Sequence, residues 1–176
     1  LVITSMSIKS SQTLVEEAQK NIETLKPSDV KILIEKKEIT LIDVRDIREL
    51  WKEGTVENSK HIPRGMLEFW LDPESSYYKL NKIKDVKKMV LFCALGWRSA
   101  LATKSLVDMG FKNVAHVDGG FDALKKNGFN IVKKETWLPS NYEEYLDKDK
   151  MIFYRYEIYF EDYSISEILT ELLTYT

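Results

Sequence analysis

Residues 89–99 read M-V-L-F-C-A-L-G-W-R-S, and this stretch decides the fold. The apolar run 90–92 is typical of a strand that is buried on both faces of a parallel sheet. Gly96 follows the run, and residues 98–109 then have the pattern of a helix. The only cysteine of the chain, Cys93, therefore lies between the carboxyl end of a strand and the start of a helix.

Two further apolar runs, residues 40–44 and 114–117, have the same character. A helix is predicted after the first run, over residues 46–53, and a shorter one after the second, over residues 121–126. Strands that alternate with helices form parallel sheets with right-handed crossovers. The sequence therefore predicts an α/β fold, with a central parallel sheet flanked by helices on both faces. Ligands bind beyond the carboxyl ends of the strands in such sheets, which is where Cys93 lies.

The remaining segments divide the chain into three parts. Apolar residues at steps of three and four over residues 10–25 predict an amphipathic helix, so we expect residues 1–26 to form an N-terminal helical extension. Residues 27–135 hold the alternating strands and helices, with a long irregular loop predicted over residues 55–85. Residues 136–176 are polar and aromatic in places and form a C-terminal extension to which no motif gives a role.

Composition and charge narrow the functional class. The chain of 176 residues has 26 Lys and Arg against 28 Asp and Glu, so its net charge of −2 gives no bulk attraction for nucleic acid or an anionic membrane. The apolar stretches are too short to span a membrane. The N-terminus has no secretory signal pattern and a single cysteine cannot form an internal disulfide, which favours a cytoplasmic, reducing location. Two histidines, His61 and His116, and one cysteine do not favour a zinc site.

Two interpretations of Cys93 are open from its position alone. A lone cysteine in an apolar run is often a small buried hydrophobe. Its place before a loop with Gly96 and Arg98 favours a nucleophile, because the first amides of a helix have no internal partners and glycine lets a loop curl so that its N–H groups point inward. Helix N-termini and nearby cations lower the pKa of a thiol from its free value of about 8.5. The thiolate is the reactive form of such a group.

Four motifs resemble those of the rhodanese (sulfurtransferase) family. Residues 93–99, C-A-L-G-W-R-S, resemble its active-site loop, which reads Cys-x-x-Gly-x-Arg-Ser in many single-domain members. Residues 41–45, L-I-D-V-R, resemble its first motif, and residues 116–121, H-V-D-G-G-F, resemble its closing motif. Residues 63–69 resemble an insertion of a bacterial subgroup. The resemblance covers roughly residues 27–132, and the four motifs occur in the family's order.

One motif of the family departs from its usual form. Residues 54–59 stand where the family usually has Gly-His-Ile-Pro-Gly-Ala, and the His and Pro of that motif are replaced. His61 lies beyond this position, and we expect it to be an ordinary, partly exposed loop histidine.

The resemblance implies a single rhodanese-like domain that moves sulfane sulfur through Cys93. The thiolate would attack the outer sulfur of a donor such as thiosulfate or a persulfide, and the persulfide left on the cysteine would pass its sulfur to a thiol, cyanide or a protein. It implies no metal and no organic cofactor, and the protein would be a monomer or a homodimer. Besides the catalytic cysteine, the implied site has a substrate-binding loop and three supporting residues: Ala94, Leu95, Gly96, Trp97, Arg98 and Ser99 in the loop, with Asp43, Arg45 and Glu49 in support.

The roles of two loop residues stay open. Arg98 could face the donor, or it could turn inward to pair with Asp43 or Glu49 and anchor the loop. The second alternative is favoured because Asp43 and Arg45 follow the neighbouring strand, where the loop needs a brace. Trp97 could be a lid over the donor or an exposed aromatic residue at a docking surface.

Two competing functions remain. Phosphatase loops that place Cys and Arg in a similar cradle have five residues between them, whereas residues 94–97 number four, and Phe92 stands where tyrosine phosphatases commonly have His. A rhodanese-like module that only binds or regulates a partner is the second alternative, although such modules often lose the cysteine that this chain keeps.

Overall fold

The structure, a computed structural model, describes residues 8–79, 82 and 84–133. The chain divides into two compact units, Leu1–Lys134 and Glu135–Thr176. The predicted C-terminal extension, residues 136–176, lies outside the described residues.

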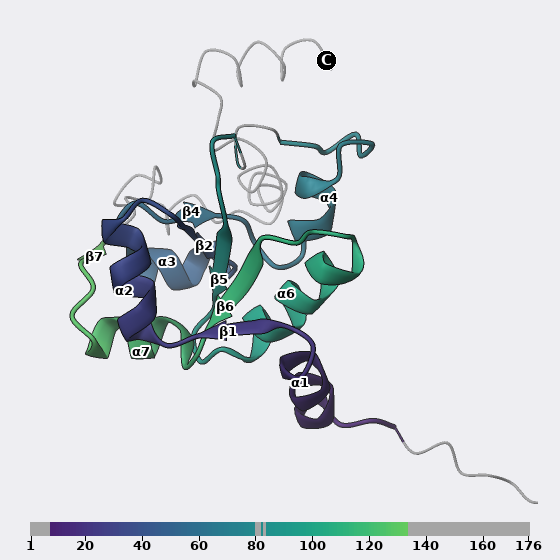
Figure 1. The fold of residues 1–176 in the computed structure, drawn as a ribbon, viewed down its shortest axis with the longest axis horizontal. Coiled ribbons are helices and arrows are strands. Elements are labelled where there is room, and N and C mark those ends of the chain that lie inside the picture. Colours follow the sequence, from purple (N-terminus) through teal and green to yellow (C-terminus); the bar gives the residue numbers. More distant parts are fainter. Residues whose placement is uncertain (1–7, 80–81, 83, 134–176) are drawn as a thin grey trace, which may run out of the picture. The chain divides into compact units, whose positions relative to one another are not determined.

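A five-stranded parallel sheet forms the centre of the first unit (Figure 1). Its strands lie in the order β1 (Glu23–Leu25), β6 (Val114–Val117), β5 (Met89–Phe92), β2 (Thr40–Asp43) and β4 (Lys60–His61). A separate antiparallel pair is formed by β3 (Thr55–Val56) and β7 (Ile131–Val132). The predicted central strands and their parallel direction are therefore confirmed.

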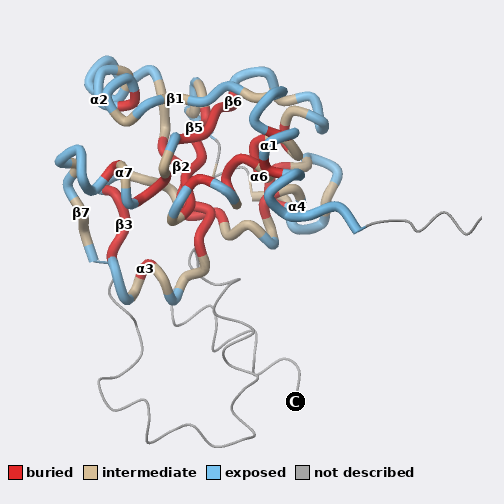
Figure 2. Tube along the Cα trace, turned by 90° about the horizontal axis from the view of Figure 1, so that it is seen from below, coloured by how far each residue is buried: buried red, intermediate tan, exposed pale blue. Residues whose placement is uncertain are grey.

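Helices cover both faces of this sheet, as predicted (Figures 1 and 2). One face carries α4 (Leu67–Leu71) and α6 (Trp97–Asp108), with α1 (Ser11–Gln19) packed against α6, and the other carries α2 (Pro27–Glu35) and α7 (Gly120–Lys126). A further helix, α3 (Ile47–Glu53), follows β2. Among the described residues, no helix combines the length and the apolar character that a membrane span requires.

The continuous apolar run of β5 follows from this burial on two sides. Successive side chains of a strand point to opposite faces. Val90 and Phe92 therefore pack in the core beneath α2 and α7, whereas Leu91 and Cys93 pack in the core beneath α4 and α6. The alternation points the sulfur of Cys93 toward the α6 side of the sheet.

Two predictions about segment structure are wrong. The helix predicted over residues 10–25 ends at Gln19, and Glu23–Leu25 instead form the edge strand β1, which pairs with β6. The irregular loop predicted over residues 55–85 contains β3, β4 and α4, and Trp70 of α4 is buried in the core. In both cases the structure depends on pairing or packing with distant segments, which local sequence patterns do not report.

Candidate active site

The loop after β5 wraps around the sulfur of Cys93. The backbone N–H of Gly96 donates a hydrogen bond to Cys93 Sγ at 3.2 Å. Gly96 has a φ of +95°, which glycine adopts readily, and it is the residue from which α6 starts. The amides of the first turn of α6 also have no intrahelical partner. Cys93 itself is 1% exposed, so very little of its surface is accessible to a reactant.

A second loop, at the start of α7, holds the first one in place. Phe121 N–H donates to the carbonyl of Cys93 at 2.7 Å, and Asp122 N–H donates to the carbonyl of Ala94 at 3.2 Å. Gly120 has a φ of +59°, and a Cβ on it would lie 2.3 Å from the Cys93 carbonyl oxygen. The two loops can approach this closely only because residue 120 is glycine.

Arg98 forms a two-pronged ion pair with Glu49 of α3. The distances are 2.6 Å from Nη1 to Oε2 and 2.8 Å from Nη2 to Oε1. These hydrogen bonds lower the pKa of Glu49 and raise that of Arg98, and smaller contributions to the raised pKa come from Cys93. The guanidinium group therefore pairs with Glu49 rather than with Asp43.

Glu49 is itself positioned by the start of α3. The side chain of Asp46 accepts from Arg48 N–H at 3.0 Å, and Glu49 Oε2 accepts from Asp46 N–H at 3.1 Å. This reciprocal arrangement is a capping box, which fixes the first turn of a helix. The helix cap thus places the carboxylate that meets Arg98.

Asp43 and Arg45 form a buried ion pair beneath the two loops. Both side chains are fully inaccessible, and Arg45 Nη2 donates to Asp43 Oδ2 at 2.8 Å. Arg45 also donates to the carbonyl of Gly54 at 2.7 Å, and its guanidinium lies 3.8 Å from the centroid of the Phe121 ring. Arg45 therefore ties the end of β2 to the loop that starts α7.

His116 contributes to the site from beneath α6, although its sequence context indicated no role. Its Nδ1 lies 3.5 Å from Ser99 Oγ, and Ser99 Oγ donates to the carbonyl of Gly96 at 3.0 Å. His116 Nε2 and Thr24 Oγ1 are 3.0 Å apart. Burial lowers the pKa of His116, which favours the neutral ring. The available signal was a histidine within an otherwise apolar strand.

The prediction that His61 is a partly exposed loop histidine is wrong. His61 is the second residue of β4, it is buried, and its Nε2 lies 2.9 Å from the carbonyl oxygen of Arg45. The pairing of β4 with β2 creates this contact, because it sets His61 beside Asp43 in the sheet.

Two large apolar side chains of the cysteine loop are exposed. Leu95 and Trp97 are 55% and 56% exposed, and they stand on either side of Gly96, whose amide holds the sulfur. The buried Ser99 completes the set, so the seven loop residues lie together around the carboxyl end of β5.

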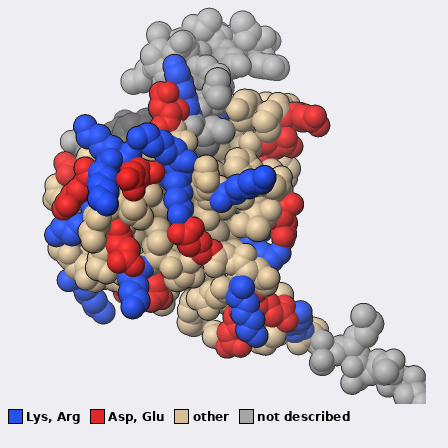
Figure 3. Space-filling model, viewed as in Figure 1, with Lys and Arg blue, Asp and Glu red and all other residues tan. Residues whose placement is uncertain are grey.

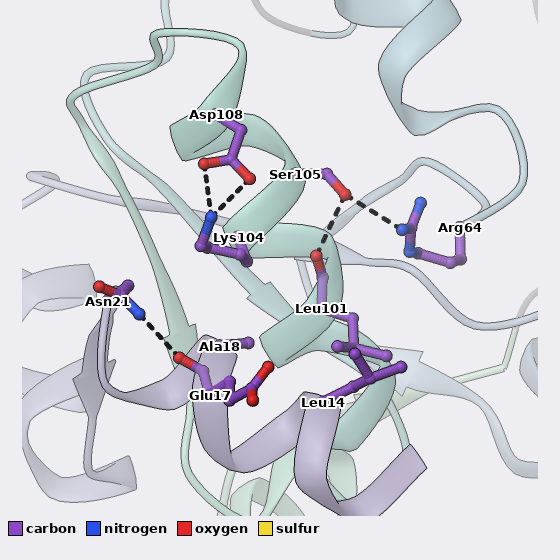
Figure 4. Close-up of a pocket in the computed structure, with 9 residues that line it drawn as sticks. All are labelled: Leu14, Glu17, Ala18, Asn21, Arg64, Leu101, Lys104, Ser105 and Asp108. Carbon is purple, nitrogen blue, oxygen red and sulfur yellow. Dashed lines mark hydrogen bonds and ion pairs between the residues drawn. The ribbon is translucent and has the colours of Figure 1, made fainter. Parts of the chain in front are cut away.

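A separate groove of about 560 Å³ lies between α1 and α6 (Figure 4). None of the loop residues 93–99 lines it. Its charged side chains are paired within the fold: Lys104 with Asp108, Arg64 with Glu68, and Glu17 with Lys9. On the face of the molecule in Figure 3, basic and acidic side chains are interspersed, in keeping with the near balance of charge.

Within the part of the chain that the structure describes, no group of three or more His, Cys, Asp or Glu side chains is placed to hold a metal ion.

Comparisons with known proteins identify the fold. The chain is 35% identical over 102 residues to rhodanese-like domain-containing protein 17 of Arabidopsis thaliana, and the match spans 52% of this chain and 62% of the relative. A solved structure of a protein of unknown function from Rhodopseudomonas palustris, described as a possible tyrosine phosphatase, is 41% identical, with a TM-score of 0.67 and coverage of 72% of this chain and 96% of that one. The polysulfide-sulfur transferase homodimer of Wolinella succinogenes is 34% identical, with a TM-score of 0.52 and coverage of 73% and 91%. The rhodanese-like domain family matches residues 26–127, and the chain belongs to this family.

Proposed function

We propose that this protein is a sulfurtransferase that carries sulfane sulfur as a persulfide on Cys93. The observation that supports this most directly is the hydrogen bond from Gly96 N–H to the cysteine sulfur, at the carboxyl edge of the sheet and at the start of α6. A helix N-terminus and an inward amide favour a negatively charged sulfur. The family membership and the sulfur transferase among its relatives agree with this chemistry.

The proposed reaction has two steps, and in each step one bond to the transferred sulfur forms while another breaks. The Cys93 thiolate attacks the outer sulfur of the donor, and the donor bond breaks with its electron pair going to the leaving group, which is sulfite from thiosulfate or a thiolate from a persulfide. An acceptor thiolate or cyanide then attacks the terminal sulfur of the persulfide, and Cys93 leaves as the thiolate. No net oxidant or reductant is consumed, because the sulfur keeps its oxidation state as it passes from donor to acceptor.

The loop residues have distinct parts in this proposal. The Gly96 amide and the amides of the first turn of α6 stabilise the negative charge on the sulfur in both steps. Arg98 contributes positive charge from one side and anchors the loop through Glu49. Asp43 and Arg45 act as buried support, because they hold the ends of β2 and of the α7 loop together.

Two other functions make different predictions. A phosphatase function is raised by the description of the R. palustris protein, but the four residues between Cys93 and Arg98 form a shorter loop than the five-residue loops of that chemistry. A module that only binds a partner would have no use for the amide directed at the sulfur.

Mass spectrometry of the intact protein tests the proposal. After incubation with thiosulfate or an alkyl persulfide and removal of the excess, we expect the wild-type chain to gain the mass of one sulfur atom, and Cys93→Ala to gain nothing. Cyanide should then remove the added mass and release thiocyanate. A wild-type chain that gains no sulfur from either donor would exclude the enzyme and favour the binding module, and hydrolysis of an aryl phosphate that depends on Cys93 would favour the phosphatase.

A further inference from the structure

The charges of Cys93, Arg98 and Glu49 do not favour an anionic donor. Arg98 is the only cation among residues 93–99, and both of its terminal nitrogens donate to the carboxylate of Glu49, which neutralises its charge. With the sulfur ionised, the thiolate, the guanidinium and the carboxylate leave one net negative charge. Thiosulfate brings two further negative charges to this position.

Two neighbouring arginines are also paired with carboxylates. Arg48 pairs with Asp46 at 2.7 Å, and Arg45 is held by Asp43 at 2.8 Å with Glu53 at 3.3 Å. Each of these guanidinium groups already faces at least one carboxylate, so neither offers an unpaired positive charge to a dianion.

The chain neighbours of Gly96, the residue whose amide contacts the sulfur, offer exposed apolar side chains instead. Leu95 and Trp97 are each more than half exposed, on either side of the glycine whose amide holds Cys93 Sγ, and residue 94 is alanine. Exposed aromatic and aliphatic side chains beside a buried reactive atom favour a ligand with a hydrocarbon portion, because its contact with them removes apolar surface from water.

We infer that the preferred sulfur donor is an organic persulfide with an apolar substituent, and that thiosulfate is a poor donor for this protein. The inference rests on the proposed sulfurtransferase function and narrows its substrate class. The substituent lies against Trp97 and Leu95 while the outer sulfur of the persulfide meets Cys93 Sγ. The thiolate forms a bond to that outer sulfur, the S–S bond of the donor breaks, and the organic thiolate leaves with the electron pair.

The expected preference for an alkyl persulfide over thiosulfate has two causes, the charge of the donor and its apolar contact with Trp97 and Leu95. Their effects can be measured separately. An alkyl persulfide carries at most one negative charge, so it meets less repulsion than thiosulfate does. Added salt screens like charges. Loading of the cysteine by thiosulfate should therefore become faster as salt is added, whereas loading by the alkyl persulfide should change little.

The test compares the second-order rate constants for persulfide formation on Cys93, followed by mass spectrometry in the wild-type chain. The probes are thiosulfate and the ethyl, butyl and hexyl persulfides. We expect hexyl persulfide to react at least about tenfold faster than thiosulfate, with each lengthening of the chain worth up to about threefold, which corresponds to partial burial of the added methylenes. Trp97→Ala should flatten this dependence on chain length.

Glu49→Gln tests the electrostatic source, because it removes the charge that neutralises Arg98 and keeps the shape of the side chain. We expect it to raise the thiosulfate rate constant, relative to that for hexyl persulfide, by about fivefold. Glu68→Gln is the matched control: Glu68 also accepts two hydrogen bonds from one arginine, Arg64, and is 29% exposed against 28% for Glu49, but it lies on α4. In Glu68→Gln, the ratio of the thiosulfate rate constant to the hexyl persulfide rate constant should change by less than about twofold.

The outcomes separate the donor assignment from the proposed function. The donor assignment is overturned if thiosulfate loads the wild-type chain as fast as hexyl persulfide does, or faster. It is also overturned if Glu49→Gln and Glu68→Gln show the same ratio of the thiosulfate rate constant to the hexyl persulfide rate constant. A rate constant that does not depend on the alkyl chain removes the role of Trp97 and Leu95. Absence of sulfur on Cys93 with every probe refutes the proposed function itself.

Discussion

Gly120→Ala should be among the most damaging single-methyl substitutions in this protein, although it lies outside the cysteine loop. The added Cβ would stand 2.3 Å from the carbonyl oxygen of Cys93, 2.8 Å from that of Ala94 and 2.8 Å from the amide nitrogen of Gly96. All three of these atoms belong to the backbone, which cannot rotate away as a side chain can. The loop that holds the sulfur must therefore move by about 1 Å.

The loss in the free energy of unfolding caused by Gly120→Ala has two parts. A non-glycine residue at the φ of +59° costs about 1–2 kcal/mol by itself. Displacement of the backbone adds about 1–3 kcal/mol of overpacking and weakens the hydrogen bonds from Phe121 and Asp122 to the loop carbonyls, at about 0.5–1.5 kcal/mol each. The total is about 3–8 kcal/mol, against a typical stability of about 5–15 kcal/mol for a domain.

Two control variants isolate these parts. Gly128 has a φ of +76°, and a methyl group added there would have no neighbouring atom within 4 Å, so Gly128→Ala should show the backbone cost alone, about 1–2 kcal/mol. Gly65 has neither a positive φ nor a close neighbour, so Gly65→Ala should change stability by less than about 1 kcal/mol. Urea unfolding of the three variants, with slopes compared to check for two-state behaviour, gives the differences directly. If Gly120→Ala were no more destabilising than Gly128→Ala, the close approach of the two loops would not exist in solution.

Three further predictions concern the residues that support the loop. Arg45→Met should lower the free energy of unfolding by about 3–5 kcal/mol, because it leaves the buried carboxylate of Asp43 unpaired, and chemical denaturation measures this loss. Asp46→Ala should cost about 1 kcal/mol through loss of the α3 cap, whereas Arg48→Ala, which removes only an exposed ion pair, should cost less than half as much in the same assay. The lowered pKa of His116 means that the unfolded chain binds a proton at a higher pH than the folded chain does, so stability should fall as the pH drops through about 6.5, and thermal melts of His116→Asn should lack this part of the pH dependence.

The central strands and the reactive loop could be predicted because their signals are local. The buried strands β2, β5 and β6 appear as short apolar runs, and the loop appears as a glycine and an arginine after a single cysteine. Residues 67–71 also carry a local signal, which the prediction of an irregular loop overlooked: Leu67, Trp70 and Leu71 have the i, i+3, i+4 spacing of a helix face, and all three are buried.

Other features could not be predicted because they depend on contacts between distant segments. The spacing of apolar residues up to Leu25 fits a helix, yet Glu23–Leu25 form a strand because β6 offers them a pairing edge. His61 is polar and follows a turn, and its burial becomes visible only when β4 pairs with β2. Arg98 likewise pairs with Glu49 rather than with Asp43 because Asp43 is already bonded to Arg45.

The cysteine motif by itself therefore does not determine what the site can do. A side chain at residue 120 would displace the carbonyl groups of Cys93 and Ala94. The Gly96 amide would then no longer point at the sulfur, although the sequence of residues 93–99 is unchanged. A neutral residue at position 49 would leave Arg98 free to receive a dianion, again without any change between residues 93 and 99. Donor preference within such a fold should accordingly follow the residue on the first turn of α3 that meets the loop arginine. The substitution Glu49→Gln directly measures how strongly the donor preference depends on this residue.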